Sequence, residues 1–173
     1  RGLGDVYKRQ IIKGAAVGFA DVPLCEKEPY IIRYAEMIDN WAECDCFCSC
    51  IKVKKSEADD LLRLAEGLMY RKEEFVSRVG TVLMFSKFSD EPTVRKALTI
   101  YDRLPGGEYY RDMAVAWGIS VYCVRYPQLI VKYLEHSPIS IAVKLAAAQK
   151  IRDSRRISDE VKHRVTDTVN AQR

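Results

Sequence analysis

Apolar residues recur with helical spacing along most of the chain, and no segment shows the alternating pattern of strands joined by a hairpin turn. In FVSRVGTVL the apolar residues Phe75, Val79, Val82 and Leu83 occupy positions i, i+4, i+7 and i+8, which form one face of a helix. The segment 110–126 is apolar nearly all round, as expected for a central helix covered on most sides. The sequence therefore predicts an all-α chain of roughly ten short helices and no sheet.

Start and stop signals divide this pattern into separate helices. Ser56 is a predicted N-cap, with Asp59 at the capping-box position and Asp60 in the first turn. Further caps are predicted at Ser89 or Asp90, followed by Pro92 in the first turn, and at Ser158. Breaks are predicted at 103–110, at Tyr126-Pro127 and at His136-Ser137-Pro138.

Size and charge limit the class of protein. The 173 residues, of which 48% are hydrophobic, suit one globular domain with a sizeable core. A net charge of +4 permits an anionic partner without requiring one. We expect no membrane span, because no apolar run reaches about 18 residues. The first residues lack the apolar stretch of a signal peptide, so we expect a cytoplasmic protein with reduced thiols.

The amino terminus differs in character from the rest. The run DVYKRQ, residues 5–10, resembles the translation of a transposon end used to build sequencing libraries. We therefore expect residues 1–10 to be non-native and the natural protein to begin earlier.

Four of the six cysteines lie within NWAECDCFCSC. On a helix Cys44 and Cys48 share one side while Cys46 and Cys50 share another, so the four thiols cannot surround one metal ion. Disulfides within one helix are also geometrically poor. We favour small buried apolar side chains over a metal site, and expect no metal and no cofactor. The same interpretation applies to Cys25 and Cys123.

Three predicted helices are spaced like copies of one unit. They contain Trp41, Arg78 and Trp117, which follow one another at intervals of 37 and 39 residues. Such spacing of helix pairs is typical of a helical repeat array, in which equivalent helices stack and one face becomes a concave surface. Trp41 and Asp45 share a helix face at i and i+4. If the helices stack in register, all four residues face one groove.

Each of these four residues has a simpler interpretation. Taken alone, Trp41 and Trp117 are better explained as core aromatics, and Asp45 as a surface carboxylate or local cap. Arg78 taken alone is better explained as a snorkelling side chain or a structural ion pair, and only the repeat spacing favours a shared site.

Four segments resemble the AlkD-like DNA alkylation repair family, which are bacterial HEAT-like repeat DNA glycosylases. They are IDNWAECDCFCSCIK, FVSRVGTVLMFSKF, YYRDMAVAWGISVYCVRYP and AQKIRDSRRIS, and the similarity covers about residues 11–160. The resemblance implies a HEAT-like helical repeat solenoid of stacked antiparallel helix pairs with a concave DNA-binding face. It also implies that residues 11–173 form a DNA alkylation repair domain, here without its amino-terminal repeats and from a divergent branch.

The resemblance also implies an activity and its residues. The family hydrolyses the N-glycosidic bond of N3- and N7-alkylated purines in double-stranded DNA. Asp45 matches the catalytic aspartate, Trp41 and Trp117 match the two groove tryptophans, and Arg78 matches the groove arginine. An alkylated purine is already cationic and leaves readily, so no general acid is needed. Asp45 would stabilise the oxocarbenium-like sugar and orient the attacking water.

Groove affinity would come from cations on phosphates. The expected DNA-binding residues are Arg78, Arg111, Lys144, Lys150, Arg152 and Lys54, although the run KVKK around Lys54 is equally explained as a solvated loop. We expect a monomer. Two other functions remain open: a non-catalytic repeat protein that recognises distorted or branched DNA, and a protein–protein scaffold.

Overall fold

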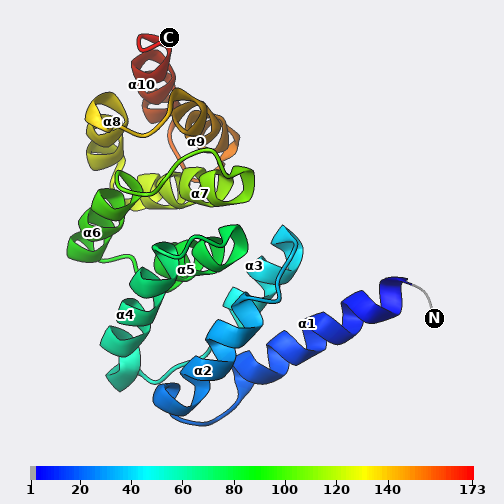
Figure 1. The fold of residues 1–173 in the computed structure, drawn as a ribbon. Helices are drawn as coiled ribbons and strands as arrows, with labels where there is room; N and C mark the ends of the chain where they lie inside the picture. Colours follow the sequence, from blue (N-terminus) through cyan, green and yellow to red (C-terminus); the bar gives the residue numbers. More distant parts are fainter. Residues whose placement is uncertain (1–2) are drawn as a thin grey trace. The chain divides into compact units, whose positions relative to one another are not determined.

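The computed structural model describes residues 3–173, with side chains from Lys8 onward, and every regular element in this range is helical. The all-α prediction is thus confirmed, as is the expected number of helices: there are ten α-helices and one short 3₁₀ helix (Figure 1). The chain divides into two compact units, one ending at Ser86 and the other beginning at Lys87, and each is described by itself. Within the described residues, no helix combines the length and the apolar character needed to cross a membrane.

The first unit contains five α-helices. They are α1 (Leu3–Phe19), α2 (Leu24–Ala35), α3 (Trp41–Cys50), α4 (Ala58–Met69) and α5 (Glu74–Lys87), with the 3₁₀ helix η1 (Lys55–Glu57) before α4. Helices two apart in sequence pack together, α1 with α3 and α2 with α4. The predicted boundary between residues 10 and 11 falls inside α1, and residues 1 and 2 lie outside the described residues. That residues 1–10 are non-native stays a prediction.

The second unit contains the other five helices. They are α6 (Glu91–Tyr101), α7 (Tyr109–Arg125), α8 (Pro127–His136), α9 (Ile141–Asp153) and α10 (Asp159–Asn170). Here too helices two apart pack together, α7 with α9 and α8 with α10. Some consecutive helices also contact each other, namely α1 with α2, α6 with α7, α7 with α8, and α9 with α10.

The predicted helix starts are confirmed at two of three places. Asp90 accepts a hydrogen bond from the backbone N–H of Thr93 at 3.0 Å, and Ser158 caps α10 in the same way. Ser56 is not a cap, because it lies within η1 and α4 begins only at Ala58. The reason is Glu57, whose carboxylate accepts the backbone N–H of Leu24 at 2.7 Å and thereby fixes the turn that precedes α4.

Two helices are buried over most of their surface. The prediction of an enclosed helix is confirmed for α7, whose buried residues occur on several sides. The prediction of a single apolar face on α5 was too narrow, because every residue from Val76 to Phe85 is buried. Polar residues inside α5 bond within the fold: Ser77 Oγ donates to the carbonyl of Met69 at 2.7 Å, and Thr81 Oγ1 donates to the carbonyl of Ser77 at 2.9 Å.

Candidate functional site in the first unit

Helix α3 begins at Trp41 because Asn40 caps it. The Asn40 side chain accepts the backbone N–H of Glu43 at 2.9 Å, and Asn40 itself has extended backbone angles. The buried Glu43 carboxylate then accepts the hydroxyl of Tyr34 at 2.5 Å. Burial raises the pKa of Tyr34, and the hydrogen bond to Glu43 raises it further, so this phenol remains a donor. These contacts fix the first turn of α3, and Asp45 follows in the next turn.

Asp45 and Arg78 form an ion pair between α3 and α5. The Nη2 nitrogen of Arg78 donates to both carboxylate oxygens of Asp45, at 2.8 Å and 3.1 Å. The Arg78 side chain is only 6% exposed, whereas that of Asp45 is 22% exposed. The ion-pair interpretation of Arg78 is confirmed, and the carboxylate keeps an edge toward solvent.

Trp41 lies one helical turn before Asp45 on α3. Its side chain is 57% exposed, so the interpretation of Trp41 as a core aromatic is wrong. An exposed indole one turn from a partly exposed carboxylate gives this end of α3 an apolar, electron-rich surface beside a negative charge.

Trp117, the remaining member of the predicted site, belongs to the second unit. It is half-buried on α7, and its carbonyl accepts the hydroxyl of Ser120 at 2.7 Å. The structure thus brings Asp45 and Arg78 into contact, and Trp41 lies one helical turn before Asp45 on α3. That Trp117 shares their groove stays a prediction.

Besides Arg78, two of the predicted DNA-binding cations, Arg111 and Lys144, are buried. Arg111 is 2% exposed and donates through Nη2 to the carbonyl of Pro105. Lys144 is 5% exposed, its Nζ donates to Gln172 Oε1 at 2.6 Å, and burial lowers its pKa. A phosphate contact from either residue would require these bonds to break and the side chain to leave its position.

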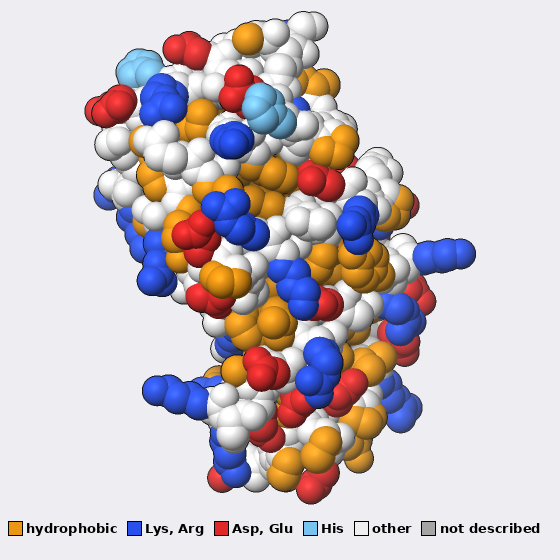
Figure 2. Space-filling view, turned by 90° about the vertical axis from the view of Figure 1, so that its left-hand side faces the viewer, with side chains coloured by type: hydrophobic (Ala, Val, Ile, Leu, Met, Phe, Trp, Pro, Cys, Tyr) orange, Lys and Arg blue, Asp and Glu red, His pale blue; other side chains and the backbone are white. Residues whose placement is uncertain are grey.

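The other predicted cations are nearer to solvent. Lys54 and Arg152 are exposed and Lys150 is half-buried. Arg152 donates to Gln149 Oε1 within α9. Figure 2 shows a face of the molecule on which Lys and Arg alternate with Asp and Glu, so the described residues drawn there do not form a continuous basic surface.

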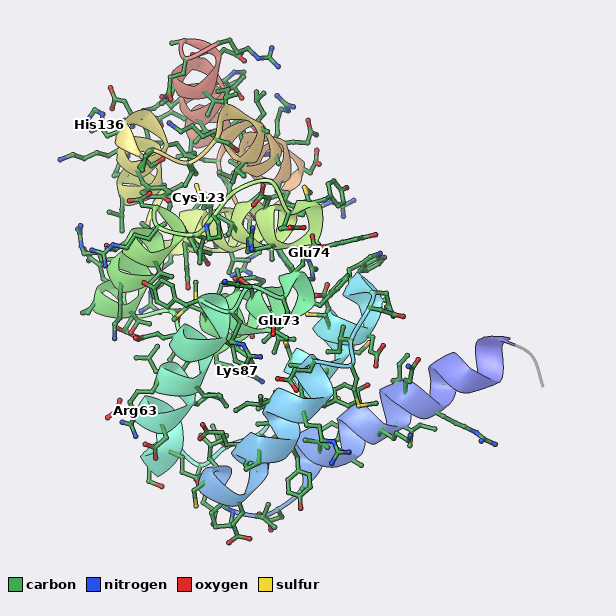
Figure 3. All side chains as sticks on the ribbon, in the orientation of Figure 1. Arg63, Glu73, Glu74, Lys87, Cys123 and His136 are labelled. Carbon is green, nitrogen blue, oxygen red and sulfur yellow. The ribbon has the colours of Figure 1, made fainter. Side chains whose placement is uncertain are left out.

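The cysteines divide between the two sides of α3 as predicted. Cys44 and Cys48 are buried, Cys46 is exposed and Cys50 is intermediate. Burial also raises the pKa of Cys123 to about 12, and Figure 3 shows this residue among the helices of the second unit. The expectation that all six are buried is wrong for Cys46 and for Cys25, which is exposed. All six are free thiols, and among residues 3–173 no group of three potential metal ligands lies within reach of one ion.

Two structurally important residues were missed in the sequence. Glu43 follows Asn40 by three positions, which is the capping-box spacing that would have indicated its position. Lys27 gave no signal, yet it is 3% exposed, and its Nζ donates to the carbonyls of Lys52 at 2.8 Å and Gly18 at 3.4 Å. The buried ammonium of Lys27 therefore links the end of α1 to the loop after α3. The carbonyls of Gly18 and Lys52 lie outside the regular hydrogen bonding of a helix, so they accept this donor.

Comparison with models of known protein families, with curated proteins and with solved structures gives no match for this chain.

Proposed function

We propose that this chain is an alkylpurine DNA glycosylase with a HEAT-like repeat fold, which hydrolyses the N-glycosidic bond of N3- and N7-alkylated purines in duplex DNA. The observation that carries the proposal is the Asp45–Arg78 ion pair with the exposed Trp41 one turn away. The resemblance of the four sequence segments to the AlkD-like family supplies the reaction.

The packing of helices supports a repeat fold. In each unit, two pairs of helices that are two apart in sequence pack side by side, as in a stack of antiparallel helix pairs. The spacing of Trp41, Arg78 and Trp117 agrees with this, because they lie on α3, α5 and α7, three alternate helices. A HEAT-like solenoid explains both facts with one arrangement.

Asp45 is suited to stabilise positive charge on a sugar. A carboxylate offers about four lone-pair positions, and Arg78 occupies one on each oxygen. The remaining positions are available to a water molecule or to an oxocarbenium-like sugar at the solvent-exposed edge. No general acid is needed, because an alkylated purine leaves as a neutral base.

Arg78 takes a different role from the one expected from the sequence. A guanidinium that is nearly buried and bonded to both oxygens of Asp45 is placed to orient the carboxylate, not to hold a phosphate. In our proposal Arg78 is therefore a positioning residue. Trp41, which is exposed, offers its ring to the cationic nucleotide, an interaction of about 0.5–2 kcal/mol.

The test is release of 7-methylguanine from methylated duplex DNA by the full chain. We expect release by the parent protein and a loss of roughly 10²-fold or more in Asp45→Asn. Asp59→Asn, which changes an exposed carboxylate on α4, is the matched control and should leave release unchanged. Absence of release by the folded parent protein, or full activity of Asp45→Asn, would reject the proposal.

One observation favours a second candidate, a DNA-binding repeat protein without catalysis. Both oxygens of Asp45 are engaged by Arg78, as in a purely structural ion pair. This candidate predicts salt-sensitive binding to distorted or branched duplexes, no base release, and the same affinity in Asp45→Asn.

A further inference from the structure

A pocket of about 380 Å³ lies in the second unit, between α7 and the end of α9. One wall comes from a single face of α7, at positions i, i+3, i+4 and i+7, and the other from the last turn of α9 and the residues after it. The lining residues are Trp117, Ser120, Val121 and Val124 on the first wall, and Lys150, Asp153, Ser154 and Arg156 on the second.

The first wall is apolar and only partly covered. Trp117, Val121 and Val124 are all half-buried, although α7 is otherwise largely enclosed. The Ser120 hydroxyl donates to the carbonyl of Trp117 at 2.7 Å. A strip of indole and two valines is thus left accessible inside a concave site, which suits a planar or apolar group.

The second wall carries two cations, Lys150 and Arg156. Within the part of the chain that the structure describes, the side chains of Lys150 and Arg156 make no ion pair and no hydrogen bond. The one carboxylate of the pocket, Asp153, accepts the amide of Gln149 at 2.8 Å instead. The helix dipole accounts for a cation at Lys150, in the last turn of α9, but not for Arg156, which lies beyond the helix.

We infer that this pocket binds one nucleotide unit, with its phosphate between Lys150 and Arg156 and its sugar or base against Trp117 and the two valines. Paired cations recognise a phosphate, and an accessible indole stacks on any base. The volume lies near the lower end of the range for small-molecule sites, about 300–1,000 Å³, so it suits a single unit. The choice of a nucleotide as the ligand rests on the function proposed above. The observation of free cations beside an aromatic wall is independent of that function.

The experiment uses the full chain carrying Trp41→Phe, so that Trp117 is the only fluorescent indole. AMP should quench its fluorescence saturably, and adenosine, which lacks the phosphate, should bind roughly tenfold or more weakly. In the same background Lys150→Gln/Arg156→Gln should weaken AMP binding by about tenfold or more. Lys132→Gln/Arg103→Gln removes the same charge from exposed positions of the second unit outside the pocket and should leave it unchanged.

Competition experiments distinguish a nucleotide within a nucleic-acid strand from a free nucleotide as the natural ligand. A single-stranded oligonucleotide or a duplex that competes with AMP identifies a nucleotide within a strand, whereas AMP binding without such competition identifies a free nucleotide. Equal binding of AMP and adenosine, or equal loss in the pocket and control variants, overturns the inference. AMP binding by a protein that releases no 7-methylguanine rejects the glycosylase and leaves the nucleotide site in place.

Discussion

A single guanidinium nitrogen of Arg78 contacts both carboxylate oxygens of Asp45, at 2.8 Å and 3.1 Å, although the two residues are 33 positions apart. The contact joins α3 to α5, and Cys48 and the carbonyl of Val79 approach each other at 3.7 Å between the same helices. Arg78 is almost fully covered while Asp45 retains access to water. The ion pair therefore links α3 to α5 and also leaves one edge of the Asp45 carboxylate open to water. Its contribution to the free energy of unfolding can be measured separately from any role of that open edge.

A double-mutant cycle measures the structural effect. With Asp45→Asn, Arg78→Gln and the double variant, we expect a coupling of about 1.5–3 kcal/mol in the free energy of unfolding, because the bond is charged and largely covered. The Asp60–Arg63 pair on α4, whose side chains are 49% and 72% exposed, is the matched control and should give about 0–1 kcal/mol. Figure 3 shows Arg63 on the outside of its helix. Urea unfolding followed by circular dichroism gives both values, and equal coupling in the two pairs would contradict the prediction.

Much of the helical fold could be predicted because helices depend on local pattern. The cap at Asp90 and the enclosure of α7 were both predicted from residues close in sequence, and both predictions were correct. Ser56 was misassigned because a long-range bond, from the N–H of Leu24 to Glu57, decides where α4 begins. Local rules contain no information about such a partner.

The site could be predicted less completely, for the same reason. Trp41 and Asp45 were identified as site residues because they share one helix face. The sequence did not show, however, that Arg78 bonds to Asp45. Nor did it show that Arg111 is covered and bonded to the carbonyl of Pro105. A basic residue in a sequence is normally assigned to the surface, since burial of a cation is costly without a partner. The carbonyl of Pro105, six positions before Arg111, becomes a partner only in the folded chain.

Thiol reactivity should separate the cysteines into classes. Cys25 and Cys46 should react rapidly with a disulfide reagent at mildly alkaline pH, because both are exposed. Cys44, Cys48 and Cys123 should react only on unfolding, since they are buried and burial raises the pKa of Cys123 to about 12.

The release of the chromophoric thiol, followed with time, measures these classes. Cys46→Ser should remove about half of the fast phase, because two exposed thiols contribute to it in the parent protein. A fast phase that survives in Cys25→Ser/Cys46→Ser would show that the half-buried Cys50 or a buried thiol is accessible, contrary to the expectation.

Acid should weaken the contact between Arg71 and Glu73. Arg71 donates to both oxygens of Glu73, at 2.9 Å and 3.1 Å, and this hydrogen bonding lowers the pKa of Glu73 from 4.5 to about 2. Because the folded-state pKa is the lower one, the contact stabilises the fold above pH 4.5, and this stability is lost as the pH falls from about 4.5 to about 2. The free energy of unfolding should therefore fall less steeply over this range in Arg71→Gln than in the parent protein.

Urea titrations at several pH values across this range give the two slopes. Glu73→Gln, which removes the titrating group itself, should flatten the profile as Arg71→Gln does. Parallel profiles for the parent and both variants would mean that the contact does not persist in solution, where water competes for both exposed groups.

Two glycines of the first unit should respond to alanine in opposite ways. A Cβ on Gly80 would lie 2.5 Å from the backbone nitrogen of Met69 and 2.6 Å from the carbonyl oxygen of Ala65, so it would force α5 away from α4. Gly80→Ala should lower the free energy of unfolding by about 3 kcal/mol, at the upper end of overpacking costs, because the opposing atoms are backbone and cannot rotate away.

Gly67 is the matched control, since it also lies within a helix of this unit. A Cβ there meets no atom within 4 Å, so alanine adds helix propensity without a clash, and Gly67→Ala should raise the free energy of unfolding by about 0.5–1 kcal/mol. Thermal and urea unfolding of the two variants should thus shift in opposite directions from the parent protein. If Gly80→Ala were as stable as Gly67→Ala, α4 and α5 would not approach at backbone distance, contrary to the prediction.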